Sequence, residues 1–235
     1  KKIEGAASIS NGLSIGDDYH LSSKGVEDFS RQNGLLIKFE TFHFAKAFSD
    51  HFYTLAAQPI WRKNLSLSCI TQNSECDILS AMRTLRSHQT GIDITDANKK
   101  GSNRDVCMHA HGLVGRHQTT NSMIVILNPT DPMIFTTATS LACTSIFKPV
   151  TLGNALDDSL DENVQTSSLW SNHYGITKSI AKRPELLRYH IPSRSEIECS
   201  YIKLLHKQKR KDFSLLKNLQ KQSLQWENEL IEMYR

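Results

Sequence analysis

The sequence lacks the local motifs that identify several common enzyme classes. It contains no Gly-x-Ser-x-Gly elbow, no Walker loop, no His-Glu-x-x-His pair and no glycine-rich dinucleotide fingerprint. It has no run of about 18 apolar residues, which a membrane-spanning helix requires, and no visible signal peptide. We therefore expect no membrane partner. The chain begins with Lys1 and not with Met, so it is expected to be a piece of a longer protein.

Cysteine is present, but not in an arrangement typical of disulfide scaffolds or zinc ribbons. The five cysteines are an odd number, and no two of them have the Cys-x2-Cys spacing of a metal site. Cys69 and Cys76 are seven residues apart, the spacing of two residues on one face of a helix. We expect reduced structural thiols, which are typical of a reducing compartment, and we place the protein in the cytoplasm.

Charge of one sign is only slightly in excess, with a formal net charge of +4. Such a small excess favours solubility and does not indicate a nucleic-acid partner. The basic residues are densest between Lys203 and Lys221, where aromatic residues do not alternate with them. This run is predicted to be the solvated face of a helix. The alternative is a basic helix that docks on acidic partners or nucleic acid.

The first half of the chain is predicted to be mainly helical. Alternating small and β-branched residues predict a strand over 5–16, with Gly12 and Gly16 at turns. Apolar residues at helical spacing predict helices over 42–57, 60–70 and 74–88. Ser74 is the predicted cap of the last of these helices.

Short β-rich runs follow, separated by turns that contain Gly or Pro. Helices followed by strands within one core indicate an α+β fold. We expect the helices to pack on one sheet system whose strands lie near 6–15, 105–111, 121–128, 133–139 and 143–148.

Three segments are predicted: 1–153, 154–192 and 193–235. The middle segment starts with an acidic stretch that lacks the ligand alternation of a calcium-binding loop, so it is predicted to be a linker before a helical piece. The last segment is predicted to be one long helix, because Ser193 and Glu196 form a capping box after Pro192. Its leucines should pack on the body of the protein or on another subunit.

Two clusters of polar residues could carry chemistry. Cys107, His109 and His111 would share one face of a strand, as a Cys–His pair or a metal-binding face. No fourth ligand is evident, so packing in the core is the favoured interpretation, and no metal or cofactor is expected. The second cluster, 116–122, is rich in hydroxyl groups and could line a substrate pocket or form an ordinary hairpin loop.

Five blocks of sequence, in order, resemble segments of the secernin and cysteine-dipeptidase family. The blocks are Ile9-Ser-Asn-Gly-Leu-Ser-Ile15, Val106-Cys-Met-His-Ala-His-Gly112, Arg116-His-Gln-Thr-Thr-Asn-Ser-Met-Ile124, Thr137-Ala-Thr-Ser-Leu-Ala-Cys-Thr-Ser-Ile-Phe-Lys-Pro149 and Ser168-Leu-Trp-Ser-Asn-His173. Two positions depart from the family pattern: His111 stands in place of a glycine, and the segment from Thr139 to Cys143 lacks a proline.

The resemblance implies part of the αββα sandwich of N-terminal-nucleophile hydrolases, together with a long C-terminal helix. It implies hydrolysis of amide bonds in dipeptides or similar small amides by an N-terminal cysteine. By resemblance, Asn11 would donate to the oxyanion, and Arg116, Thr119 and Thr120 would contact substrate. Lys1 has no thiol, so the nucleophile is expected outside this chain.

The resemblance also defines the expected partners and an alternative function. The expected partners are a small peptide or amide substrate and either the missing N-terminal segment or a second copy of the chain. The alternative is a non-catalytic, secernin-like interaction protein.

Overall fold

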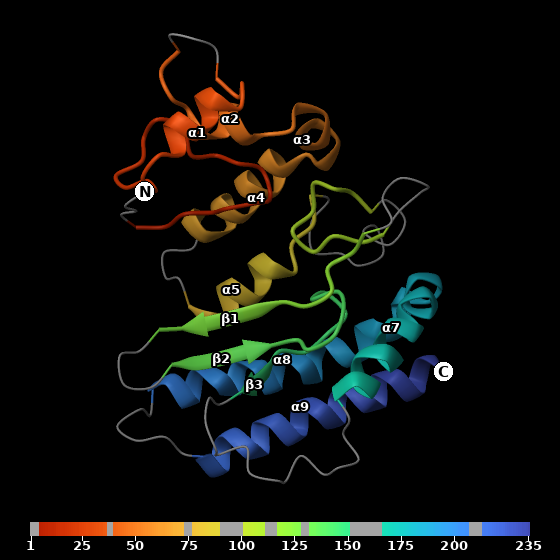
Figure 1. Ribbon diagram of the computed structural model, residues 1–235. Helices are drawn as coiled ribbons and strands as arrows, with labels where there is room; N and C mark the ends of the chain where they lie inside the picture. Colours follow the sequence, from red (N-terminus) through yellow and green to blue (C-terminus); the bar gives the residue numbers. More distant parts are fainter. Residues whose placement is uncertain are drawn as a thin grey trace.

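The computed structural model of the chain describes residues 5–36, 40–72, 77–89, 101–110, 117–127, 132–150, 166–206 and 213–235. Its helices are α1 (Val26–Gln32), α2 (Phe44–Phe48), α3 (His51–Ala57), α4 (Pro59–Gln72), α5 (Ile78–Leu85), α7 (Thr166–Lys182), α8 (Pro184–His206) and α9 (Phe213–Tyr234). Figure 1 shows α1 to α4 at one end of the molecule and the sheet with α5, α7, α8 and α9 at the other. The α+β class is thereby confirmed.

A small antiparallel sheet, in the order β1-β2-β3, lies in the second part. Its strands are β1 (Met123–Ile126), β2 (Met133–Thr136) and β3 (Lys148–Val150). The predicted strands near 121–128 and 133–139 are confirmed. The predicted strand over 143–148 is wrong for most of its length, because the chain turns there and pairs with β2 only from Lys148 onward.

The segment 6–15 is not a strand of this sheet, contrary to the prediction. It lies along α4 and reaches α2, away from the sheet (Figure 1). Gly12 approaches Pro59 so closely that a Cβ there would lie 2.4 Å from the proline Cγ. Ile9 is 80% exposed, so the alternation of residue types does not produce a buried face. A segment of small residues fits against a helix surface as readily as into a sheet.

The segment 105–110 is also not part of a β-ladder among the described residues. Its backbone instead makes single hydrogen bonds to two other segments. Cys107 N donates to Ser87 O over 3.1 Å, and Met108 O accepts from Thr119 N over 2.9 Å. These isolated bonds satisfy its backbone groups without a regular strand.

The predicted helices in the first half are present, with different boundaries. The helix expected over 42–57 is split into α2 and α3, because the Asp50 carboxylate accepts from Tyr53 N and starts a new helix. The helix over 60–70 corresponds to α4, which begins at Pro59. Asp77 caps α5 by accepting from Ser80 N over 2.7 Å. The predicted cap, Ser74, lies outside the described residues.

The C-terminal part folds back on itself and is not a single helix from 193 to 232. α8 begins at Pro184 and continues through Pro192, so the predicted boundary at Ser193 falls inside this helix. The Ser193 hydroxyl donates to His190 O and does not cap a helix start. α9 then runs antiparallel to α8, because Trp226 Nε1 donates to His190 O and the Tyr201 hydroxyl is 2.8 Å from that of Ser223.

The main hydrophobic core lies between the sheet and α5, α7, α8 and α9. Leu204, Leu216, Leu219 and Leu230 are buried in it, which confirms that the tail packs on the body. A second, smaller cluster around Leu36, Phe42 and Ala47 joins α1 and α2. Within the described ranges, no helix combines the length and the apolar composition needed to cross a membrane.

Candidate functional site

Asn11, the predicted oxyanion donor, is exposed where the N-terminal segment meets α4. Its side-chain oxygen accepts a hydrogen bond from Arg62 Nη2. Arg62 also donates to Ala57 O and to Asn103 O, so it joins three segments. Because the oxygen of Asn11 is bound by a guanidinium, the amide NH2 is the end that can donate to another group.

A groove with an apolar floor lies next to this junction. It is lined by His51, Thr54, Leu55, Gln58, Pro59, Ile60, Trp61 and Arg104. The Arg104 guanidinium stacks on the Trp61 ring, 4.6 Å from the centroid, and donates to Gln58 Oε1. An aromatic wall beside a fixed cation can hold an apolar side chain together with a carboxylate.

Of the predicted substrate-binding residues, Arg116 lies outside the described residues, and the two threonines make structural contacts. The Thr119 hydroxyl accepts from Met108 N over 2.9 Å. The Thr119 carbonyl accepts from Leu141 N, so this residue links the second and fourth sequence blocks. Thr120 is exposed, and its carbonyl accepts from Trp170 Nε1.

Replacing Thr119 by Val should destabilise the protein by about 1–3 kcal/mol, because the isosteric side chain leaves the Met108 N–H without its acceptor. Thr120→Val is the matched control, since the Thr120 side chain is exposed, and it should change stability by less than about 0.5 kcal/mol. Urea denaturation followed by circular dichroism measures both. Equal effects of the two variants would contradict the structural role of Thr119.

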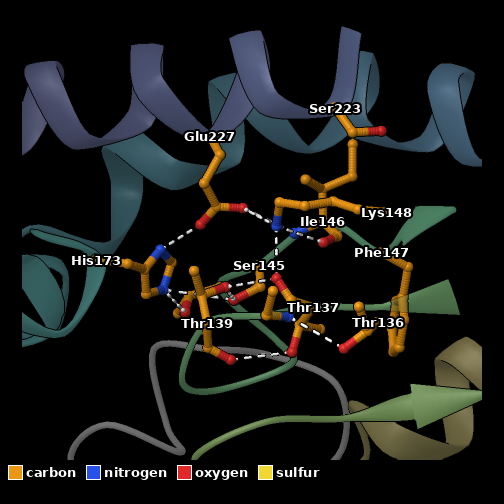
Figure 2. Close-up of polar contacts among 12 residues, drawn as sticks. Thr136, Thr137, Thr139, Ser145, Ile146, Phe147, Lys148, His173, Ser223 and Glu227 are labelled. Carbon is orange, nitrogen blue, oxygen red and sulfur yellow. Dashed lines mark hydrogen bonds and ion pairs between the residues drawn. The ribbon is translucent and has the colours of Figure 1, made fainter. Parts of the chain in front are cut away.

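A buried ionic network joins α7, α9 and β3 (Figure 2). Glu227 is fully buried, and its carboxylate binds Lys148 Nζ at 3.0 Å and His173 Nδ1. The other ring nitrogen of His173 is 3.0 Å from the Thr144 hydroxyl. Burial alone raises the pKa of Glu227, but the charges of Lys148 and His173 outweigh it and lower that pKa to about 2.

A second buried network fixes the loop that precedes β3. Arg86 makes a bidentate ion pair with Glu198, with N–O distances of 2.8 and 2.6 Å. It also donates to Ala142 O and Ser145 O, while Arg194 donates to Cys143 O over 2.8 Å. Burial and the nearby charge of Arg86 lower the pKa of Arg194 to about 10. The loop around Cys143 is therefore held from two helical segments.

Two histidines and two cysteines meet in the interior beside this loop. We name them the Cys2His2 cluster: His88, Cys107, His109 and Cys143, whose ligand atoms all lie within 4.8 Å of one another. Each side chain is at most 3% exposed. The two histidine Nε2 atoms are 3.2 Å apart, and His109 Nε2 is 3.1 Å from Cys143 Sγ.

The two thiols of the cluster differ in acidity. Burial alone raises the pKa of Cys107, but hydrogen bonds with Cys143, His109 and His88 outweigh it and lower that pKa well below its ordinary value. Burial raises the pKa of Cys143, and the neighbouring Cys107 raises it further.

The local sequence pattern points to half of this cluster. The alternation of Cys107 and His109 indicates a possible Cys–His pair, whereas His111 lies outside the described residues. His88 and Cys143 were missed because they are 21 and 34 residues from His109 and no local spacing connects them. Cys107, Cys143 and Cys199 carry free thiols.

Comparison with known proteins gives no relative for this chain. No protein-family model matches it. No curated protein and no solved structure matches it either.

Proposed function

We propose that this chain is the C-terminal part of a secernin-like amidohydrolase, which cleaves the amide bond of dipeptides or similar small amides through an N-terminal cysteine. The cysteine would be supplied by a segment outside this sequence. The proposed fold is part of an αββα sandwich, in which the sheet with α8 and α9 forms one β-layer and one α-layer.

The observation that carries the proposal is that four of the five sequence blocks form one core. Thr119, in the third block, bonds to Met108 of the second and to Leu141 of the fourth. His173, in the fifth block, contacts Thr144 of the fourth. Blocks that are separate in sequence but mutually bonded in space are expected of one inherited structural unit.

In the remaining block, Asn11 bonds to Arg62, and its neighbour Gly12 lies against Pro59 of the groove wall. In the proposed reaction the cysteine thiolate attacks the amide carbonyl, and its own α-amine, with an ordinary pKa of about 7.7–8.0, takes the thiol proton. The Asn11 NH2 donates to the oxyanion. Arg104 would bind the carboxylate of the substrate.

The test compares this chain with the longer product of its gene. The 235-residue chain alone should not release amino acids from dipeptides, whereas the longer protein should. In the longer protein, Asn11→Ala should lower kcat by about 10²–10³ with little change in KM, because the donor acts mainly in the transition state.

The matched control is Asn218→Ala, since Asn218 is exposed on α9. It should leave kcat unchanged. Hydrolysis by the 235-residue chain that disappears when one of its own cysteines is replaced would contradict the proposal. An unchanged kcat for Asn11→Ala would remove Asn11 from the mechanism.

A further inference from the structure

We propose that the Cys2His2 cluster is a closed tetrahedral Zn²⁺ site that stabilises the core of this protein. The inference does not depend on the proposed amidohydrolase function, because every residue of the site belongs to this chain. It goes against the expectation from sequence that no metal is bound.

The ligand atoms are already close to the positions that a zinc ion requires. Zinc lies about 2.0–2.1 Å from histidine nitrogen and about 2.3 Å from thiolate sulfur. At tetrahedral angles two such nitrogens are about 3.4 Å apart, and a nitrogen and a sulfur are about 3.6 Å apart. The separations are 3.2 Å between His88 and His109 and 3.1 Å between His109 and Cys143, and all four ligand atoms lie within 4.8 Å of one another. Shifts of about 1 Å or less, which side-chain rotation supplies, would complete the geometry.

Hydrogen bonding among these groups alone is incomplete. His109 Nε2 faces both His88 Nε2 and Cys143 Sγ at hydrogen-bonding distance. A ring nitrogen carries either one proton or one lone pair, so it cannot serve both neighbours fully. A metal ion at the centre would accept a lone pair from each of the four groups.

Charge also favours a divalent metal over an empty cluster. Two thiolates and two neutral imidazoles neutralise Zn²⁺, and the protons of the two thiols leave on binding. The guanidinium groups of Arg86 and Arg194, which donate to the carbonyls of the Cys143 loop, add positive charge beside the two sulfur atoms. Paired sulfur and nitrogen ligands select zinc over Mg²⁺ or Ca²⁺.

The backbone holds the three contributing segments in place before any metal binds. Cys107 N donates to Ser87 O, next to His88, and Thr119 connects Met108 to Leu141. Arg86 and Arg194 bind the carbonyls of the Cys143 loop. A site with prearranged ligands loses less entropy on binding.

The proposed metal is structural and not catalytic. Catalytic zinc sites keep one coordination position for water, with three protein ligands, whereas structural sites use four. Here four protein groups converge, and each is at least 97% buried. The ion would tie the segment after α5 to the segment before β3.

The test begins with the unmodified chain, purified anaerobically with reductant and stripped by a chelator. Elemental analysis after dialysis against zinc should give one zinc per chain. Cobalt in its place should show the intense visible bands of a tetrahedral site and the near-ultraviolet bands of thiolate ligation. Zinc at one hundred times its Kd should raise the Tm by roughly 5–10 °C.

The matched variants are Cys143→Ser within the cluster and Cys199→Ser at an exposed thiol. The first should abolish the thiolate bands or lower zinc affinity at least about 100-fold, and the second should bind as the unmodified chain does. If Cys143→Ser does not fold, the cobalt spectrum of the unmodified chain still shows whether the metal is tetrahedral and bound by thiolates. Absence of bound metal, an octahedral cobalt spectrum, or a Cys107–Cys143 disulfide in the anaerobic protein would each overturn the proposal.

Discussion

Replacing Glu227 by Gln should lower the free energy of unfolding by about 3–5 kcal/mol, which is the usual cost of removing one partner of a buried ion pair. The substitution preserves shape but leaves Lys148 charged and buried without a counter-ion. Lys148 is 3% exposed, and its remaining acceptors are backbone carbonyls. Chemical denaturation at neutral pH measures the loss.

The control is Glu232→Gln on the same helix, where the side chain is exposed and the change should be less than about 0.5 kcal/mol. A double variant, Lys148→Met with Glu227→Leu, replaces the pair by apolar groups and should recover most of the loss. A Glu227→Gln protein as stable as the unmodified one would show that the pair contributes nothing in the folded state.

The same carboxylate should make stability depend on pH in the acid range. Its pKa is about 2 in the folded protein against an ordinary value of 4.5, so the folded state binds the proton less tightly than the unfolded state. The contribution is therefore present above about pH 5 and lost as the pH falls to about 2. Its size is about 3 kcal/mol. The difference between unmodified protein and Glu227→Gln should narrow over this interval.

A chain that ends at Pro192 should lose cooperative folding altogether. It would lack the second half of α8 and all of α9, whose buried apolar residues are Tyr201, Leu204, Leu216, Leu219, Trp226, Leu230, Ile231 and Tyr234. Burial of each such side chain contributes about 1.5–3 kcal/mol, so their sum reaches or exceeds the usual 5–15 kcal/mol of net stability. Arg86 and Lys148 would also lose their carboxylate partners.

The expected measurement is a calorimetric scan without a thermal transition. A chain that lacks only the exposed Arg235 is the control and should melt as the complete chain does. A sharp transition in the chain ending at Pro192 would show that α9 is an appendage, in conflict with its contacts in the core.

The C-terminal segment also allows a test of the alternative in which its basic residues bind nucleic acid. Part of the basic run between Lys203 and Lys221 lies outside the described residues, and the described part exposes Lys203, Lys217 and Lys221. Attraction of a few such lysines to phosphate is weak at physiological salt. Fluorescence anisotropy with duplex DNA should therefore show no saturable binding. Sub-micromolar affinity that disappears with Lys217→Ala and Lys221→Ala would favour the alternative.

Local patterns predicted the parts of this fold that depend on local interactions. The strands around Met123 and Met133 follow from β-rich runs separated by a turn with two prolines, and α5 follows from its apolar stripe. Local reasoning failed at Pro192, because a proline in a helix interior normally marks a boundary. Here the packing of α8 on α9 and on the sheet maintains the helix through it.

The buried charges could not be read from neighbouring residues, since Arg86 and Glu198 are 112 positions apart. One signal was nevertheless present. Glu227 lies at helical spacing from Leu219, Ser223 and Leu230, on the buried face of α9. A carboxylate within an apolar stripe predicts a buried cation, though not which cation. The candidate metal ligands His88 and Cys143 gave no comparable signal.

The connection between Lys148 and Glu227 has a consequence for synthesis on the ribosome. The two residues are 79 positions apart. At a synthesis rate of about 5–20 residues per second, Glu227 is therefore added to the chain roughly 4–16 s after Lys148. During that time β3 cannot be buried without leaving an ammonium group uncompensated in the interior. Nascent chains that do not yet include Glu227 therefore expose apolar strands. They should depend on chaperones and be substrates for quality-control proteases until α9 has emerged.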